Sequence, residues 1–437
     1  MMATNYDAIV VGGGLAGVVA ARELQFRGMR TVILEARSRL GGRAWTAEFG
    51  GGQIEMGGQN IYWTEPHIWS EVTRYGLEIA EVAPFETYAI AEGDGLRRYP
   101  SSDARAQLGA GFDAFFGDYG SVIPRPYDPT YNRDRLADVD RLSIQGRLDQ
   151  IELPPDVDRW LKPWLGMRTG GAPDAGAFTW LLHIYALADW NWAKILEISS
   201  RYRLVGGMKS LIDAIFADSG AALCLDAPVM HIADEGDRVF VATEGGETFA
   251  APVAVVATSA NMWSHITFDA GLSDAKLASS RAGMQTPTAF TKLWALVRGE
   301  VENVYVQRPN VEDHPIIHLR KDMRRPDGLT QIIAFSVDPT LDTADHARIA
   351  RLFRETVPMP HAEVVEVTAH NWVADPFTRG GTSLLRPGQL SMLDEIRRPE
   401  GRLTFATADI ASATPGFDGA IQTGIMAAGN AVRIARH

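Results

Sequence analysis

Cysteine is almost missing from this sequence. Cys224 is the single cysteine in 437 residues, so no disulfide can form within the chain and no cysteine-rich metal site can exist. The ten histidines show no metal-ligand spacing either. We therefore predict no bound metal, and we expect the chain to reside in a reducing compartment, the cytoplasm.

Runs of basic residues and of apolar residues are also missing. Lys and Arg number 42 against 54 Asp and Glu, which gives a net charge of −12, and no Lys/Arg cluster suits a phosphate backbone. No run of about 18 apolar residues, long enough to span a bilayer, occurs. The first residues lack a basic leader and a cleavage site. We expect no nucleic-acid partner, no membrane anchor and no export signal.

What is present is the composition of a globular protein, with 46% hydrophobic and 22% charged residues. A length of 437 residues favours two or three domains. No internal repeat or low-complexity segment interrupts the sequence. Disordered and fibrous classes of protein are therefore excluded.

The N-terminal segment has the pattern of a βαβ unit. Residues 7–11 (DAIVV) predict a buried strand, 12–17 a glycine-rich turn, 18–26 a helix and 31–34 (TVIL) a second strand. A helical crossover between two strands is typical of parallel sheets. The sequence therefore predicts an α/β fold that begins with a doubly wound, Rossmann-like domain.

The turn carries the motif GxGxxG at Gly12, Gly14 and Gly17. Because these residues lack side chains, the backbone can approach a pyrophosphate at the positive end of the helix. Glu35 closes the second strand, where a carboxylate can accept hydrogen bonds from ribose hydroxyls. The pattern predicts a dinucleotide with an unphosphorylated ribose; a glycine turn that serves only helix packing is the weaker alternative.

Helical periods dominate residues 85–202, which contain five of the eleven tryptophans. We expect most of these tryptophans to be core residues and the rest to line a pocket. Strand patterns return in the second half of the chain, at 222–232, 238–243, 253–257, 289–297 and 332–337. The chain is therefore expected to weave between two domains.

The run EARSRLGGR at residues 35–43 adds two glycines and an arginine that suit a second phosphate contact, which favours FAD over NAD. Here the sequence resembles the flavin-dependent amine oxidase family. The motifs are most similar to those of bacterial nicotine oxidoreductases, which share this run and the pairing of W-x-x-P-H-x-W (63–69) with R-Y-G-L (74–77). The likeness continues through a Gly-Gly pair, PVMHI, FTKLWALV, WVADPFTRG and FATADIASATPGFDGAIQTG, and covers almost the whole chain.

The resemblance implies an amine oxidase fold in which FAD is buried between two interwoven domains. The Rossmann-like FAD-binding domain is expected at 1–84, 203–282 and 375–437. The substrate-binding domain, a mixed sheet with helices, is expected at 85–202 and 283–374.

The glycine motif and the resemblance together assign the cofactor contacts. Asp409 stands where the family usually has a Glu near the ribityl chain, and the helix after Gly416 would direct its positive end at the flavin pyrimidine. The family's cysteinyl-flavin position falls on Gly381, which implies noncovalent FAD. The predicted cofactor-binding residues are Gly12, Gly14, Leu15, Ala16, Gly17, Glu35, Ala36, Arg37, Gly41, Gly42, Arg43, Gly57, Gly58, Gln59, Val229, Trp372, Asp409, Phe417 and Asp418.

Lys292 corresponds to the lysine that holds a water against flavin N5 in many family members. An exposed lysine on a strand is the alternative. The two aromatic cage positions that flank the substrate nitrogen in most family members fall on Thr382 and on Gly416, or on Phe417 if a one-residue gap is allowed. At least one aromatic wall is therefore predicted to be missing.

Three further residues are candidates for the substrate side. Glu65 can orient or deprotonate a substrate, although a surface carboxylate or an N-cap before Pro66 is an open alternative. Tyr185 is a candidate catalytic residue, and Trp180 is a candidate pocket residue.

The resemblance implies an FAD-dependent oxidase of a C–N bond, which passes a hydride from the carbon beside nitrogen to flavin N5 and forms an imine. The substrate is either a small amine or a bulkier amine or amide of secondary metabolism. A flavin desaturase or isomerase acting on C–C bonds and a flavoprotein without catalysis are the alternatives. Oxygen or another electron acceptor is the second partner, and a homodimer is one possible assembly.

Overall fold

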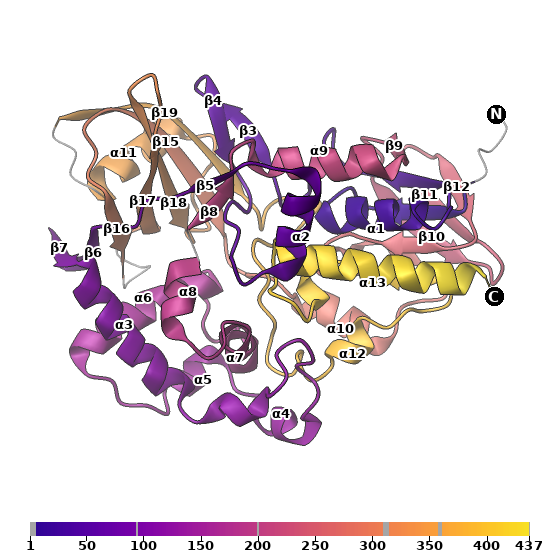
Figure 1. The fold of residues 1–437 in the computed structure, drawn as a ribbon, viewed down its shortest axis with the longest axis horizontal. Helices are drawn as coiled ribbons and strands as arrows, with labels where there is room; N and C mark the ends of the chain where they lie inside the picture. Colours follow the sequence, from indigo (N-terminus) through magenta and orange to yellow (C-terminus); the bar gives the residue numbers. More distant parts are fainter. Residues whose placement is uncertain (1–5, 93–94, 199–200, 309–313, 357–360, 437) are drawn as a thin grey trace.

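The computed structural model describes residues 6–92, 95–198, 201–308, 314–356 and 361–436. Figure 1 shows two lobes, with one lobe holding both ends of the chain and the other holding the large sheet and a group of helices below it. The chain crosses between the lobes repeatedly, because strands of each sheet come from segments far apart in the sequence. No helix among the described residues is long and apolar enough to cross a membrane.

The first lobe is built on a five-stranded sheet with the order β20-β13-β1-β2-β9. All neighbouring strands in this sheet are parallel. Its first strands are fully buried, as parallel strands covered on both faces usually are. The elements of this lobe are β1 (Ala8–Val11), α1 (Leu15–Gln25), β2 (Thr31–Leu34), β3 (Thr46–Phe49), β4 (Gly52–Glu55), α2 (Pro66–Tyr75), β5 (Ile79–Glu81), β8 (Tyr202–Leu204), α9 (Gly207–Ser219), β9 (Ala222–Cys224), β10 (Val229–Asp234), β11 (Val239–Thr243), β12 (Thr248–Ala251), β13 (Ala254–Val256), η2 (Ala260–His265), β14 (Thr267–Phe268), α10 (Asp274–Ala282), α12 (Leu393–Ile396), β20 (Leu403–Phe405), η3 (Ala408–Ile410) and α13 (Phe417–Ala435).

Small residues let the helices of this lobe pack closely. A side chain at Gly17 would collide with the Gly12 carbonyl oxygen, so α1 can begin directly against the glycine turn. A Cβ at Gly424 of α13 would lie 2.5 Å from the Ala16 carbonyl oxygen of α1. The two helices run side by side along this contact (Figure 1). The first residues of both helices, Leu15 and Phe417, line the cavity between the two lobes.

The single strand predicted for 222–232 is wrong. Residues Ala222–Cys224 extend the parallel sheet as β9, whereas Val229–Asp234 form β10 in a separate four-stranded sheet with the order β12-β11-β10-β14. Asp226 adopts a positive φ of 52°, and Pro228 has no backbone N–H to donate to a sheet. The local backbone therefore breaks the strand where the alternation of residues suggested continuity.

The second lobe is built on a seven-stranded sheet with the order β19-β15-β18-β17-β16-β6-β7. Its neighbours pair antiparallel, except for the parallel pair of β16 and β6. The elements of this lobe are β6 (Thr87–Glu92), β7 (Gly95–Pro100), α3 (Ser101–Phe116), η1 (Tyr119–Val122), α4 (Arg133–Val139), α5 (Ile144–Leu148), α6 (Pro155–Thr169), α7 (Phe178–Leu187), α8 (Trp192–Ile198), β15 (Thr291–Gly299), β16 (Val304–Gln307), β17 (Ile316–Arg324), β18 (Leu329–Ser336), α11 (His346–Thr356) and β19 (Ala362–Asn371).

The expectation of helices from residue 85 onward is wrong for the first part of that segment. Residues 87–100 form the antiparallel pair β6 and β7, and β6 pairs with β16 more than 200 residues later in the chain. Such a long-range pairing leaves little local signal. From Ser101 onward helices dominate as predicted, and Trp160, Trp164 and Trp180 are buried among them.

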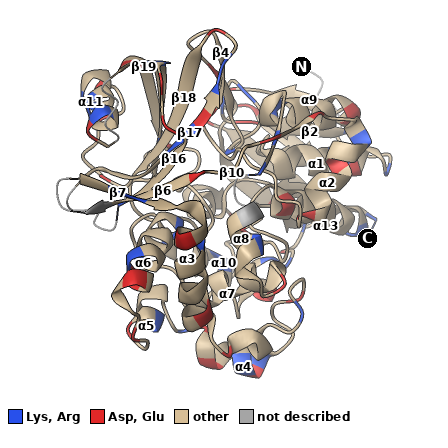
Figure 2. Cartoon of the chain, turned by 60° about the vertical axis from the view of Figure 1, so that its left-hand side comes forward, with Lys and Arg blue, Asp and Glu red and all other residues tan. Residues whose placement is uncertain are grey.

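Charged side chains of both signs are distributed over the two lobes. Figure 2 shows blue and red segments side by side on α4 and α11, for example.

The strands of the two large sheets lie within the segments predicted for the two domains. The domain boundaries themselves stay a prediction.

Candidate active site

A cavity of about 640 Å³ lies where the two lobes meet, and residues of both lobes line it. One end is formed by the glycine turn, the N-terminal end of α1 and the end of β2. The other end is formed by one face of the seven-stranded sheet together with α6 and α7. The two ends have different chemistry.

The glycine-turn end is organised around Glu35, which is 3% exposed. Its carboxylate accepts hydrogen bonds from the backbone N–H of Gly13, at 2.7 Å, and of Arg37, at 2.9 Å. Burial raises the pKa of Glu35, and these two backbone hydrogen bonds oppose the shift. The carboxyl group is thus held rigidly at the end of β2, beside the cavity.

The first turn of α1 leaves backbone N–H groups free for a ligand. Gly14 is the N-cap residue and provides no side-chain cap, and Gly14, Leu15 and Ala16 line the cavity. The Thr258 hydroxyl beside them is buried and has no hydrogen-bond partner among the described residues. Uncapped N–H groups at the positive end of a helix suit a pyrophosphate.

Most of the predicted cofactor-binding residues meet at this cavity. Those that line it are Gly12, Gly14, Leu15, Ala16, Glu35, Ala36, Arg37, Gly41, Gly42, Arg43, Gly57, Gly58, Gln59, Val229, Trp372 and Phe417. Gly17, Asp409 and Asp418 do not line it. Gly17 acts on the turn instead, since it lets α1 pack against the Gly12 carbonyl.

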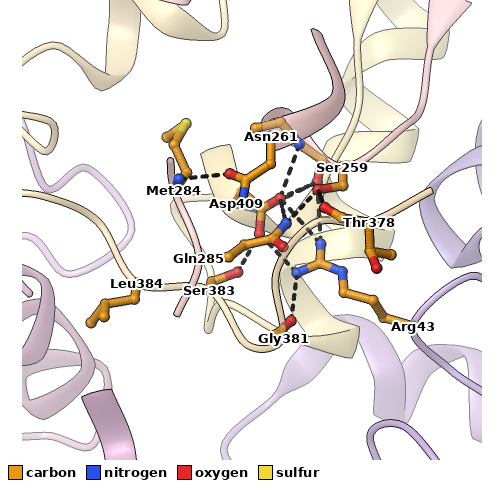
Figure 3. A network of polar contacts seen from close by, with 12 residues as sticks. Arg43, Ser259, Asn261, Met284, Gln285, Thr378, Gly381, Ser383, Leu384 and Asp409 are labelled. Carbon is orange, nitrogen blue, oxygen red and sulfur yellow. Dashed lines mark hydrogen bonds and ion pairs between the residues drawn. The ribbon is translucent and has the colours of Figure 1, made fainter. Parts of the chain in front are cut away.

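Asp409 was predicted to approach the cofactor, but its carboxylate faces a buried polar network (Figure 3). It pairs with Arg43 at 3.0 Å and accepts hydrogen bonds from Ser383 at 2.5 Å and Gln285 at 2.7 Å. Burial alone would raise the pKa of Asp409, but the Arg43 charge and these hydrogen bonds outweigh it and lower the pKa. Asp409 therefore positions Arg43, which does line the cavity.

Asp418 also has a different place from the one predicted. Its carboxylate is fully buried and accepts hydrogen bonds from the backbone N–H of His67, at 2.7 Å, and of Ile68, at 3.1 Å. These are first-turn N–H groups of α2, so Asp418 caps α2 from the start of α13. The cavity end of α13 itself is formed by Gly416, Phe417 and Ala420, with no side-chain cap.

These features fit a flavin dinucleotide. The glycines leave room for a backbone cradle, α1 and α13 both present uncapped N-termini to the cavity, and Glu35 is placed for ribose hydroxyls. The residues present at this end therefore match the donor set that the cofactor requires.

At the other end, one face of the seven-stranded sheet forms the floor of the cavity. The register places Tyr305, Arg320 and Ile333 in one row across three strands. A second row contains Gln307, His318, Phe335 and Lys292. All of these side chains line the cavity.

Lys292 lies on β15, as its neighbours predicted, but it is 3% exposed, which excludes the alternative of an exposed strand lysine. Its ammonium donates a hydrogen bond to the Gly57 carbonyl oxygen at 2.7 Å and lies 5.3 Å from the Trp294 ring centre. Burial lowers the pKa of Lys292 to about 7, against the attraction of Glu55. The lysine can therefore gain or lose a proton near neutral pH.

Glu65 lines the same end and is 2% exposed, so it is not a surface carboxylate. It occupies the N-cap position of α2 but makes no side-chain cap; its carboxylate accepts the Tyr62 N–H at 3.0 Å. Burial raises the pKa of Glu65 well above its usual range, and the nearby Asp418 charge adds to the shift. Burial therefore favours the protonated, uncharged form of Glu65.

Tyr185, predicted as a catalytic residue, does not line the cavity, so its place in the structure does not support that role. Its ring stacks on Phe116, with ring centres 4.1 Å apart, inside the helical core. Trp180, one turn earlier on α7, does line the cavity. Its indole N–H is buried without a partner among the described residues.

The cage positions Thr382, Gly416 and Phe417 all line the cavity. A Cβ at Gly416 would meet no atom within 4 Å, so this wall is open. The Phe417 ring covers Gly58, where a Cβ would lie 2.5 Å from it. At Gly381 a Cβ would lie 2.7 Å from the Phe290 ring, so the backbone there has no space for a side chain.

The polar cavity residues that were not predicted from the sequence include Tyr62, Arg168, Tyr305, Gln307, His318 and Arg320. The neighbouring Arg324 and Arg325 do not line the cavity and pair with Glu300 and Asp327 instead. The signal was present in Ile316–Arg324, where His318 and Arg320 alternate with apolar residues on one face of the strand.

A family model described as flavin containing amine oxidoreductase matches residues 15–432. The chain belongs to this family. The pseudooxynicotine dehydrogenase of Pseudomonas sp is 34% identical to it over 427 residues, which are 96% of this chain and 85% of that protein. The (S)-6-hydroxynicotine oxidase of Paenarthrobacter nicotinovorans is 28% identical, over 96% of this chain and 97% of that protein.

The fold of this flavin amine oxidoreductase recurs in solved structures. A putrescine oxidase with bound putrescine superposes with a TM-score of 0.82 over 98% of this chain and 99% of that chain, at 20% identity. A cyclohexylamine oxidase from Brevibacterium oxydans IH-35A gives 0.81 over 99% of both chains, at 19% identity. The predictions of an amine oxidase fold and of an FAD-dependent amine oxidoreductase are confirmed. The amide and C–C alternatives are not favoured.

Proposed function

We propose that this amine oxidoreductase binds its substrate as the uncharged amine on the floor of the seven-stranded sheet, beside Lys292. Bound FAD supplies the chemistry, because flavin N5 accepts the hydride from the carbon next to nitrogen. The protein binds and orients the amine and excludes water. The observation that carries the proposal is the meeting of the flavin cradle with the buried Lys292 and Glu65 in one cavity.

The charges of the cavity favour the uncharged amine. Burial raises the pKa of Glu65 and so disfavours the negative charge that would attract an ammonium group. Arg168 and Arg320 line the cavity and are positive. Positive neighbours and burial both lower the pKa of an amine. The substrate nitrogen therefore carries a lone pair when it reaches the flavin, which hydride loss from the adjacent carbon requires.

We propose that FAD is bound noncovalently. Gly381 has no thiol, and its surroundings leave no room for one. Cys224 lies on β9 and does not line the cavity. No cysteine is therefore available to form a thioether with the flavin.

We further propose a substrate larger than the small amines that a closed aromatic cage confines. The open wall at Gly416 and the small side chain of Thr382 in the cavity lining support this proposal. A bulky amine of secondary metabolism would fit such a wall. A cytoplasmic location, supported by the single Cys224, and a homodimeric assembly stay proposals as well.

Anaerobic flavin reduction tests the function. Candidate amines, including nicotine-related secondary amines of the type named for the relatives, are mixed with the purified holoprotein without oxygen. We expect the flavin absorbance to bleach and an imine or its carbonyl hydrolysis product to form. Readmitting oxygen, or an artificial acceptor, then distinguishes an oxidase from a dehydrogenase by the rate of flavin reoxidation. Bleaching with formation of a C=C bond between carbons would contradict the proposal.

A further inference from the structure

The sheet floor continues beyond Lys292 to a polar end that amine oxidation alone does not use. Lys292 lies on β15, whereas Arg320 lies on β17, with β18 between them. Neighbouring strands are about 4.8 Å apart, and Arg320 lies in the other row, two residues along the strands, so the two side chains start roughly 12 Å apart on the sheet. Tyr305 is opposite Arg320 on β16, and Gln307 follows on the same face. We call Arg168, Tyr305, Gln307 and Arg320 the distal cluster.

The distal cluster carries excess positive charge. Arg320 pairs with Asp322 at 3.2 Å, but Asp322 also pairs with Arg203 at 2.7 Å, so one carboxylate serves two guanidinium groups. Arg168 comes from α6, which packs against β17, and it makes no ion pair among the described residues. Glu65, the carboxyl group that lines this end, has a pKa raised by burial, which disfavours its negative charge. Two positive charges of the three arginines are therefore left without a counterion.

The cluster also offers hydrogen-bond donors without acceptors. The Nε of Arg168 and the Nε2 of Gln307 are buried and have no hydrogen-bond partner among the described residues. Both residues line the cavity. Burial raises the pKa of Tyr62 and of Tyr305, so both hydroxyls keep their protons, and Arg168 and Arg320 lie near both of them. Gln59 contributes one orphan acceptor, Oε1, but it directly follows the Gly57-Gly58 pair of the cofactor loop.

Buried donors without acceptors are costly unless a ligand satisfies them. A carboxylate provides two acceptor oxygens and the missing negative charge. We propose that the distal cluster binds a carboxylate of the substrate, so that the substrate is an amine with a carboxylate separated from the reacting carbon by a chain or ring spanning roughly 12 Å. An α-amino acid is too short to reach both ends. This inference rests on the proposed function, because it assumes that the amine lies beside Lys292.

The test compares matched substrates on the holoenzyme. The probes are N-methyl ω-amino carboxylates of increasing chain length, their uncharged methyl esters, and simple alkanoates that contain no amine. We expect one chain length at which wild-type kcat/KM for the acid exceeds that for its ester by roughly tenfold or more, as charge-assisted hydrogen bonds predict. Arg168→Met should lower this acid-to-ester ratio by roughly tenfold, and Arg168→Lys should retain part of it.

Two further variants keep the test decisive. Arg324 lies on β17, the strand that carries Arg320, but outside the cavity. Arg324→Met should therefore leave the acid-to-ester ratio unchanged. Gln307→Leu should lower the ratio if Arg168 variants do not fold. No acid preference at any chain length, or equal ratios in Arg168→Met and Arg324→Met, would overturn the distal cluster as a carboxylate site. If no amine reduces the flavin but alkanoates perturb the flavin spectrum of the wild type and not of Arg168→Met, the carboxylate site stands and amine oxidation fails.

Discussion

At the residue scale, Lys292 combines burial, a contact to the cofactor loop and a pKa near neutrality. Lys292→Met removes the ammonium group that donates to the Gly57 carbonyl oxygen. We expect the variant to retain FAD but to turn the flavin over more slowly, mainly in reoxidation, by on the order of a hundredfold, the usual cost of losing one preorganised donor. Stopped-flow measurement of both half-reactions checks this. Lys321→Met, on β17 outside the cavity, is the control, and equal rates in the two variants would return Lys292 to a structural role.

Glu65 predicts a pH dependence of stability. Its pKa in the folded state is raised above the ordinary 4.5 by burial, so the folded state binds a proton that the unfolded state releases. The contribution of the neutral carboxyl is fully present below pH 4.5 and is lost as pH rises through the raised folded pKa. Lys292, whose folded pKa is lowered to about 7 from 10.5, makes stability rise with pH between these two values. Glu65→Gln should remove only the fall in stability that Glu65 causes as pH rises.

The measurement is the difference in thermal midpoint between Glu65→Gln and wild type across about pH 4 to 11, a range that includes the ordinary pKa values of both groups. We expect the variant to gain stability relative to wild type as pH rises. Glu48→Gln, an exposed carboxyl on β3, is the matched control. A difference that does not change with pH would show that Glu65 is charged in the folded protein.

The small side chain of Thr382 in the cavity lining predicts that the pocket admits large substrates. Thr382→Trp adds a ring where the family usually has a cage aromatic, and overpacking a pocket typically costs roughly 1–3 kcal/mol. We expect kcat/KM for a bulky amine to collapse and kcat/KM for a small amine to persist. A proportional loss for both substrates would show that position 382 does not shape the pocket, and activity confined to small amines in the wild type would contradict the bulky-substrate proposal.

At the scale of elements, the first turn of α2 depends on a carboxylate from another helix. Asp418 of α13 accepts two backbone N–H groups of α2, and both would be left unsatisfied and buried in Asp418→Ala. We expect this variant to lose about 2 kcal/mol of stability, as for a lost cap combined with buried unpaired donors. Asp418→Asn, which keeps an acceptor, should lose less. Urea unfolding of both holoproteins measures the difference, and an unchanged midpoint in Asp418→Ala would argue against the cap.

Local signals predicted the elements that local physics determines. The apolar run before Gly12 and the glycine turn predicted β1, α1 and β2. Residues adjacent in the sequence determine the burial of these strands and the positive φ of the turn. The motifs also predicted which backbone segments reach the cavity. They failed for side-chain direction, since the carboxylates of Asp409 and Asp418 are fixed by partners hundreds of residues away. The same holds for Arg320 and Gln307, which meet only through the register of β16 and β17.

At the scale of the whole molecule, the cavity lies between two lobes, and the single chain crosses from one lobe to the other repeatedly. A ligand that binds only the folded protein stabilises it by an amount that grows with its concentration, about 2.7 kcal/mol at a hundred times its Kd. FAD contacts from both lobes should therefore stabilise the lobes together. The family implies this flavin cofactor, and the cradle of Gly14, Glu35 and Arg43 suits it.

Removal and return of FAD tests both the mode of attachment and this linkage. Acid precipitation should release intact FAD into the supernatant, because Gly381 and Cys224 offer no thioether to the flavin. The apoprotein should unfold at a lower temperature than the holoprotein, and added FAD should restore the midpoint in proportion to the logarithm of its excess. Glu35→Ala should weaken FAD binding by about 1–3 kcal/mol through lost charge-assisted hydrogen bonds, whereas Glu48→Ala should not. Flavin that remains in the protein pellet would mean a covalent bond at another residue, and an FAD-independent midpoint would mean that the two lobes hold together without the cofactor.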